Sequence, residues 1–409
     1  MPRLSEQWLR DVLGTLYQRR TMTRAQIIQA TELNSASVSH SLQHLLSRGI
    51  ILKVGELQSR AGRRRDVLTL NADANYFVAI DLQGTRIRFA LTNFVGDIRY
   101  RWEEDIEFGQ TLETGKITHG IHQVVRNLSH AQLGRLVAIG ISSPGVIERS
   151  GAITAYNLNW HKFPLMSELR KSIETPIFLE PANVTCILAE RWLGRAQNVR
   201  NCMYVRAGHG IGVGIYSNGQ FVGGRDQMAG QLGHMTIDPG AQDLCHCGRR
   251  GCLQAIASSP SIVRQYLEKT GRPHDNPAGY RIAEVFERAR QNDPAANAVL
   301  DRAGRVLGLG LSYLVSLFNP ELIILGGEFV NGEDVLLPRI KEQLASHTMP
   351  ALCEDLEITI STLGLDIGLK GAASLAFRNS LDDSVLLKKM SQPVVEMHAE
   401  IEAQVAPGA

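Results

Sequence analysis

The sequence lacks any apolar stretch long enough to cross a membrane. No run reaches the roughly 18 uninterrupted apolar residues that a membrane-spanning helix needs. The N-terminal segment also contains neither a continuous apolar region nor a small-residue cleavage site typical of a secretion signal. We therefore expect a cytoplasmic protein without membrane insertion.

Cysteine is scarce and the net charge is small. Six cysteines in 409 residues, without secretory features, argue against a disulfide framework. Hydrophobic residues at 44% and charged residues at 21% exclude general disorder, and the length predicts two or three folded units. The net charge of +2 is uneven: residues 1–71 hold 11 Lys and Arg against 5 Asp and Glu, and the remainder holds 32 against 36. The basic N-terminal part is the candidate for nucleic-acid binding.

The N-terminal part predicts three short helices. Apolar residues at helical spacing mark the first helix, and Thr23 with Gln26 has the spacing of a capping box at the start of the second. Asn34 or Ser35 can cap the third helix. Its apolar face holds Val38, Leu42, Leu45 and Leu46, and its other face holds Ser37, His40, Ser41 and His44.

Two predicted strands follow, over 50–54 and 67–70, and segment 56–66 joins them as a basic wing. This order is that of a winged helix-turn-helix, and together with the charge it predicts DNA binding. Two other interpretations stay open: a solvated charged loop, and a small helical unit that contacts proteins. The predicted DNA-contacting residues are Ser35, Ser37, His40, Ser41, His44, Arg63, Arg64 and Arg65.

From Tyr76 onward the pattern changes to strands that alternate with helices. The first series of strands covers 77–81, 86–92, 98–102 and 136–142. The second series covers 203–206, 212–216, 220–222, 322–325 and 356–361. This duplication predicts two α/β lobes with a cleft between them.

A dense group of metal-ligating residues lies in the second half of the chain. His234 is followed by Cys245, Cys247 and Cys252 within a glycine-rich turn. One imidazole and three thiolates make a tetrahedral set for zinc, and four protein ligands leave no open position for water, so the predicted site is structural. His246 is a competing ligand, although alternation around the Cys-x-Cys turn points it away from the two sulfurs. The alternative is a set of buried, metal-free cysteines.

These residues carry a family resemblance. Gly233-His234, followed after ten residues by Cys-x-Cys-Gly-x-x-Gly-Cys, resembles the signature of the ROK family, which joins bacterial sugar kinases and sugar-responsive repressors. The resemblance extends from Tyr76 to Phe377. It includes Ile141-Ser142-Ser143-Pro144-Gly145, Asn157-Leu158-Asn159-Trp160, Gly210-Ile211-Gly212-Val213-Gly214 and Leu325-Gly326-Gly327. The N-terminal winged helix makes the chain similar to the family's repressors, such as the xylose and N-acetylglucosamine repressors.

The resemblance implies an α/β fold in which a winged helix-turn-helix precedes a two-lobed, actin-like (ribonuclease-H-like) sugar-kinase fold. The expected division places the DNA-binding domain at 1–71 and the first lobe at 72–190, completed by a C-terminal helix over 368–380. The second lobe with the zinc site then covers 191–367, and residues 381–409 form a tail.

Departures from the family's kinases predict that this chain is not an enzyme. Where the kinases have Glu-Asn-Asp-Ala-Asn, with the aspartate as catalytic base, this chain has Glu180-Pro181-Ala182-Asn183-Val184. A methyl group cannot accept a proton, and general-base assistance is typically worth about a hundred- to ten-thousandfold in rate. Gln83 replaces a glycine of the phosphate cradle, and His209 replaces a threonine of the second phosphate loop. We therefore expect no catalytic residues.

The sugar-binding positions are also altered. Gln231 and Gln254 stand where the family usually has glutamates; both can hydrogen-bond hydroxyls but lack the charge of a carboxylate. The predicted carbohydrate ligands are Asn157, Asn183, Gln231, His234 and Gln254. One alternative is a pocket that senses no simple sugar, so that a protein partner controls the repressor; an active sugar kinase is a further alternative.

The resemblance finally implies partners. We expect a homodimer, or a dimer of dimers, on a pseudo-palindromic operator. A carbohydrate in the interlobe cleft is expected to change the affinity for DNA.

Overall fold

The structure is a computed structural model that describes residues 5–58, 64–83, 86–106, 112–155, 158–271 and 281–391. Of the predicted site residues, Arg63 and Asn157 lie outside these ranges, as does the side chain of Arg64. Within the described ranges, no helix combines the length and the apolar character that a membrane crossing requires.

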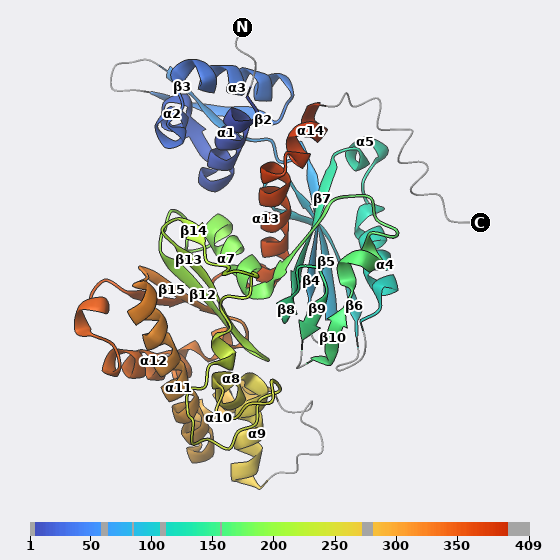
Figure 1. The fold of residues 1–409 in the computed structure, drawn as a ribbon. Coiled ribbons are helices and arrows are strands. Elements are labelled where there is room, and N and C mark those ends of the chain that lie inside the picture. The colour runs from blue at the N-terminus through green and yellow to red at the C-terminus, as the bar shows by residue number, and fades with distance from the viewer. Residues whose placement is uncertain are drawn as a thin grey trace.

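The N-terminal unit contains three helices packed on a small sheet (Figure 1). The antiparallel sheet has the order β1-β3-β2, and its first strand, of only three residues, was missed by the sequence analysis. The predicted Thr23–Gln26 capping box is present, and Asn34 rather than Ser35 caps the third helix. The elements are α1 (Glu6–Arg19), β1 (Thr21–Thr23), α2 (Arg24–Thr31), α3 (Ser35–Ser47), β2 (Ile51–Gln58) and β3 (Arg64–Leu70).

A mixed five-stranded sheet of order β11-β7-β4-β5-β6 forms the first lobe. The strands β4, β5 and β6 are antiparallel, whereas β7 and β11 run parallel to β4. The strands are β4 (Tyr76–Leu82), β5 (Arg86–Asn93), β6 (Ile98–Asp105), β7 (Leu136–Ser143) and β11 (Ile177–Pro181). Helices α4 (Thr114–Val125), α5 (His130–Leu133) and α6 (Leu165–Leu169) and a small sheet of β8 (Val146–Ile147), β9 (Ile153–Ala155) and β10 (Trp160–Phe163) accompany it.

The second lobe repeats this topology. Its sheet has the order β14-β13-β12-β15-β16, again with three antiparallel strands followed by two parallel ones. The strands are β12 (Cys202–Ala207), β13 (Ile211–Ser217), β14 (Gln220–Phe221), β15 (Leu322–Gly326) and β16 (Glu357–Ile360). The helices are α8 (Leu253–Ala257), α9 (Ser259–Thr270), α10 (Ile282–Arg290), α11 (Pro294–Phe318) and α12 (Glu333–Ser346). The predicted duplication is confirmed.

Two helices, α7 (Ala182–Leu193) and α13 (Ile367–Asp382), lie between the lobes and pack against each other (Figure 1). Their backbones approach so closely that a Cβ atom on Gly371 would stand 2.1 Å from the carbonyl oxygen of Thr185. Because the contact leaves no room for a side chain, the two helices form one unit to which both sheets are attached.

The chain beyond residue 380 begins with regular structure. Helix α13 continues to Asp382, and α14 (Val385–Ser391) follows, whereas the sequence analysis placed a tail from residue 381. Leu386 and Leu387 are buried in the core that the N-terminal unit shares with the first lobe. The guanidinium of Arg48 donates to the carbonyl oxygen of Met390 at 3.1 Å, so α14 holds the N-terminal unit against the rest of the chain.

Candidate functional site

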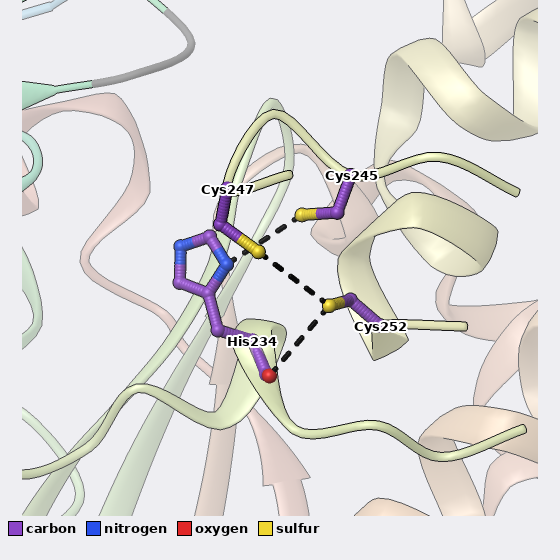
Figure 2. Close-up of side chains that lie close together, drawn as sticks. All are labelled: His234, Cys245, Cys247 and Cys252. Atoms are coloured by element: carbon purple, nitrogen blue, oxygen red, sulfur yellow. Dashed lines mark hydrogen bonds between the residues drawn. The ribbon is translucent and has the colours of Figure 1, made fainter. Parts of the chain in front are cut away.

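The four predicted metal ligands converge on one point (Figure 2). Their ligand atoms all lie within 4.8 Å of one another. Nδ1 of His234 lies 3.5 Å from Sγ of Cys245, and the sulfurs of Cys247 and Cys252 are 3.7 Å apart. A tetrahedral zinc ion with bonds of about 2.3 Å to sulfur and 2.0 Å to nitrogen separates its ligands by about 3.5–3.8 Å. The spacing of the donor atoms therefore fits zinc.

A tight turn brings the cysteines together. The amide of Gly248 donates to the carbonyl oxygen of Cys245, and the amide of Cys245 donates to that of Arg249. Gly248 and Gly251 both adopt positive φ, which a side chain would disfavour. His246, the competing ligand, is exposed and is not among the grouped ligand atoms.

The surroundings act differently on the four ligands: burial raises the pKa of the Cys245 and Cys252 thiols, whereas the pKa values of Cys247 and His234 are lowered. Burial raises the pKa of the Cys247 thiol, but hydrogen bonds from the backbone and side chain of Arg249 outweigh this and hold that pKa at about 7. Burial, assisted by Arg249, lowers the pKa of His234, so the imidazole stays neutral. A thiolate and a neutral imidazole are the forms that bind zinc.

The predicted carbohydrate ligands border this metal cluster. The side-chain amide of Gln254 donates to Sγ of Cys245 at 3.5 Å, and the backbone oxygen of Gln231 accepts from the amide of His234. Asn183 approaches from α7: a Cβ atom on Gly230 would lie 2.9 Å from its Nδ2. The amide of Asn183 donates to the carbonyl oxygen of Val213 at 2.7 Å. Gln254 is thus tied directly to the metal cluster, and Asn183 to the strand beside it.

A cleft of about 1380 Å³ lies beside the N-terminal unit, away from the metal cluster. Its lining comes from α1, α7, α13 and the β13–β14 hairpin; Asn183 lines it, whereas Gln231, His234 and Gln254 do not. Size alone does not mark the binding site, because this cleft is bounded by the N-terminal unit and holds few of the predicted ligand residues.

The catalytic-base position holds no titratable group. Ala182 is the first residue of α7, at the carboxyl end of β11, where β7 and β4 also end. Asp81, on β4, is buried, and burial raises the pKa of its carboxyl while Arg206 lowers it. Gln83 donates its amide to Oδ2 of Asp81 at 2.7 Å. Gln83, which replaces a glycine of the kinases, therefore forms a hydrogen bond with the carboxylate of Asp81 at this edge of the sheet.

A carboxylate stands beside the second glycine-rich loop, and the sequence analysis missed it. Oε2 of Glu328 lies 3.4 Å from Nδ1 of His209, and a Cβ atom on Gly208 would lie 3.2 Å from the same oxygen. The hydrogen bond with Glu328 raises the pKa of His209. The position of Glu328, directly after Gly326-Gly327, was the signal that could have revealed it.

The sequence analysis placed two of the predicted DNA-contacting residues, Ser37 and Ser41, on the wrong face of α3. Ser37 and Ser41 are 4% and 0% exposed, because they lie on the face of α3 that also buries Val38, Leu42 and Leu45. A serine is small enough to be buried next to an apolar stripe without a cavity or a clash. His40 and His44 are half-buried, and Arg65 is exposed. The exposed residues of α3 are Ser35, Ala36, Gln43 and Ser47.

The sequence model of the ROK family matches residues 77–379, which include nearly all of both sheets, α7, most of α13 and the metal cluster. The chain belongs to the ROK family. The xylose repressor of Bacillus spizizenii is 28% identical over 373 residues, covering 91% of this chain and 95% of the relative. A glucokinase of Halalkalibacterium halodurans is 30% identical, covering 73% of this chain and 94% of the relative. The predicted family is thereby confirmed.

A solved structure extends the likeness to the whole fold. It is described as a ROK family transcriptional regulator, a homologue of the Escherichia coli MLC protein, and is 26% identical with a TM-score of 0.78. The match covers 94% of this ROK protein and 98% of that chain. The xylose repressor match is longer than the stretch from Phe77 to the C-terminus, so it includes part of the N-terminal unit.

Proposed function

We propose that this ROK protein is a DNA-binding transcriptional repressor. The observation that carries the proposal is the extent of the matches. A repressor and a transcriptional regulator align over 91% and 94% of this chain, whereas a glucokinase aligns over 73%. The N-terminal unit thus belongs to the part shared with regulators.

The N-terminal unit, residues 1–71, is proposed to be a winged helix-turn-helix. Helix α2, the turn to α3 and the β2–β3 hairpin follow in the order that this motif requires. We assign α3 to the major groove and the hairpin, with Arg63, Arg64 and Arg65, to phosphates or the adjacent minor groove. Two copies of the chain, related by a two-fold axis, would then bind a pseudo-palindromic operator.

Replacing Arg63, Arg64 and Arg65 by alanine is expected to weaken operator binding and to reduce its dependence on salt. Each phosphate contact that is lost lowers the slope of log affinity against log salt by about 0.9. Affinity measured between 50 and 200 mM salt checks this result, with Arg170→Ala, which removes an exposed arginine at the end of α6 in the first lobe, as the control. An unchanged salt slope in the triple variant would assign the wing arginines to a solvated loop.

We propose further that the chain phosphorylates no sugar. Three observations support this: Ala182 at the base position, Gln83 bound to Asp81, and the Glu328 carboxylate beside the glycine loop that would receive phosphates. A carboxylate at that place repels the phosphates of a nucleotide.

Purified protein is expected to give no turnover above a buffer control in a coupled assay with ATP and a panel of sugars. Ala182→Asp alone is expected to remain inactive, because Gln83 and Glu328 stay in place; a glucokinase serves as the positive control. Turnover by the wild type that follows the protein through successive columns would contradict the proposal.

We propose zinc as the resident metal, bound by His234, Cys245, Cys247 and Cys252. When bound, the ion supplies a structural cross-link between η2 (Leu232–His234) and the loop that leads into α8. The distances between the donor atoms support this identity.

The proposed control is a carbohydrate bound by Asn157, Asn183, Gln231, His234 and Gln254 between the lobes. The guanidinium of Arg149, in the β8–β9 turn, pairs with the carboxylate of Asp226, in the segment after β14, at 2.7 Å, so the two lobes are in contact here. An exposed ion pair of this kind contributes only about 0–1 kcal/mol and can open and close with the lobes. Control by a protein partner is the second candidate, since two family glutamates are replaced.

Gln254→Leu is expected to abolish the response to carbohydrate while operator affinity stays within twofold of the wild type. The substitution removes the amide at the border of the metal cluster and leaves the N-terminal unit unchanged. Thermal shift with a carbohydrate panel and operator titration with and without the sugar measure both effects, with Gln291→Leu as the control. A wild type that neither binds nor responds to any sugar would favour the protein partner.

A further inference from the structure

The exposed face of α3 carries no positive charge. Ala36, His40, Gln43 and Ser47 follow one another at helical spacing along this face, and the whole helix from Ser35 to Ser47 contains neither lysine nor arginine. The next basic residue, Arg48, donates to the carbonyl oxygen of Met390 at 3.1 Å and is held against α14. No guanidinium from this helix is therefore available to a base edge.

The hydroxyl groups of α3 are largely engaged by the helix itself. Ser39 donates to the carbonyl oxygen of Ser35 at 2.5 Å, and Ser47 donates to that of His44 at 2.8 Å. The hydroxyl of Ser35 accepts from the guanidinium of Arg24 at 2.7 Å. Gln43, by contrast, is exposed and makes no hydrogen bond to any residue within the described ranges. Its amide is free to donate and accept at the same time.

The chemistry of this face selects one kind of base pair. Guanine presents two acceptors in the major groove, which arginine or lysine matches, whereas adenine presents an acceptor and a donor side by side, which a glutamine amide matches. A methyl group such as that of Ala36 contacts the methyl group of thymine.

We propose that α3 reads A·T base pairs, with Gln43 bonded to adenine and Ala36 against a thymine methyl group, so that Gln43 is the specificity-determining residue of the operator half-site. This inference rests on the proposed function, because it requires α3 to enter the major groove. Cationic residues flank the neutral face: Arg24 lies on α2 and Arg65 on β3. In this arrangement Arg24 and Arg65 contact the phosphates on either side of the helix, and these contacts do not distinguish one base pair from another.

Selection from a random-sequence DNA duplex library at fixed salt tests the proposal with the full chain. The wild type is expected to enrich half-sites with A·T pairs at the centre. Gln43→Ala is expected to lose discrimination at one base pair by about five- to 150-fold, since a bidentate contact is worth about 1–3 kcal/mol. Gln43→Arg is expected to shift that position to guanine. Because Gln43 is exposed, the melting temperatures of all variants are expected to match the wild type.

Gln18→Ala is the matched control, since Gln18 lines the cleft between α1 and the lobes and not the exposed face of α3. Half-sites centred on G·C pairs, or an adenine preference that Gln43→Ala leaves intact, would overturn the assignment of Gln43 while DNA binding itself stands. A wild type that enriches no duplex would instead overturn the proposed function, and this inference with it.

Discussion

Cys247→Ser is expected to reduce the zinc content from about one atom per chain to nearly none and to destabilise the second lobe. A serine hydroxyl is a poor zinc ligand at neutral pH, and structural zinc sites contribute apparent binding free energies of about 10–16 kcal/mol. Apolar packing contributes little at this point, because Cys247 is half-buried and the cluster core consists of the cysteines and Ala255; ion pairs of Asp243 with Arg264 and Arg302 hold the start of the loop in place. Elemental analysis and urea denaturation followed by circular dichroism measure the two effects.

Cys353→Ser provides the control, since Cys353 is a half-buried cysteine outside the metal cluster. It is expected to keep full zinc content and nearly wild-type stability. The carbohydrate response is a second readout: Gln254 donates to Cys245, so loss of the metal is expected to displace Gln254 and to suppress the response as well. A metal-free wild type of equal stability would contradict the zinc proposal.

The metal cluster and the paired sheets could be predicted because their signals are local. Three of the four ligands fall within the eight residues from Cys245 to Cys252, and the central strands of both sheets, such as β4, β7, β12 and β15, are short apolar runs. The repeat of these runs predicted two α/β lobes, but β11 was not among the predicted strands, so the shared topology of the two sheets is known from the structure.

Features that depend on which side of a helix or loop faces its neighbours could not be predicted from the sequence. Ser37 and Ser41 were placed on the polar face of α3, although the helix packs with those serines inward. The proximity of Glu328 to His209 arises only when separate loops meet at a sheet edge, and the Gln83–Asp81 hydrogen bond, although it joins residues two positions apart, depends on how the Gln83 side chain is oriented. No periodicity in the chain reports such contacts.

The attachment of the N-terminal unit to the lobes could not be predicted from the sequence either, since it joins three segments that are far apart in the chain. Tyr17 of α1 stacks on Trp192 of α7 with ring centroids 4.2 Å apart, and on Phe377 of α13 at 3.5 Å. The guanidinium of Arg20 lies over the Trp192 ring at 4.8 Å and donates to the carbonyl oxygen of Val95. The stack places the N-terminal unit directly on the two helices between the lobes.

This placement gives a route from lobe movement to DNA. Any change in the angle between the lobes must move α7 relative to α13, or move both together, because the pair lies at their junction. Tyr17 contacts both helices, so the orientation of α1 follows them. Two winged helices of a dimer fit successive major grooves in only one relative orientation, and a small rotation is enough to disturb that fit.

Tyr17→Ala is therefore expected to uncouple the carbohydrate from the operator. A coupling of about 1–3 kcal/mol, typical between two sites, corresponds to a sugar-induced change in operator affinity of about five- to 150-fold in the wild type. In the variant this ratio is expected to fall toward one, because α1 loses its aromatic contact with both helices, while sugar affinity measured without DNA stays unchanged. Removing a buried aromatic ring is also expected to lower the free energy of unfolding by about 3–5 kcal/mol. Tyr313→Ala, which removes a 40% exposed tyrosine from the surface of α11, should alter neither quantity. If the Tyr17 variant folds, binds the operator and still responds to sugar as the wild type does, the signal reaches DNA by a route other than the aromatic stack.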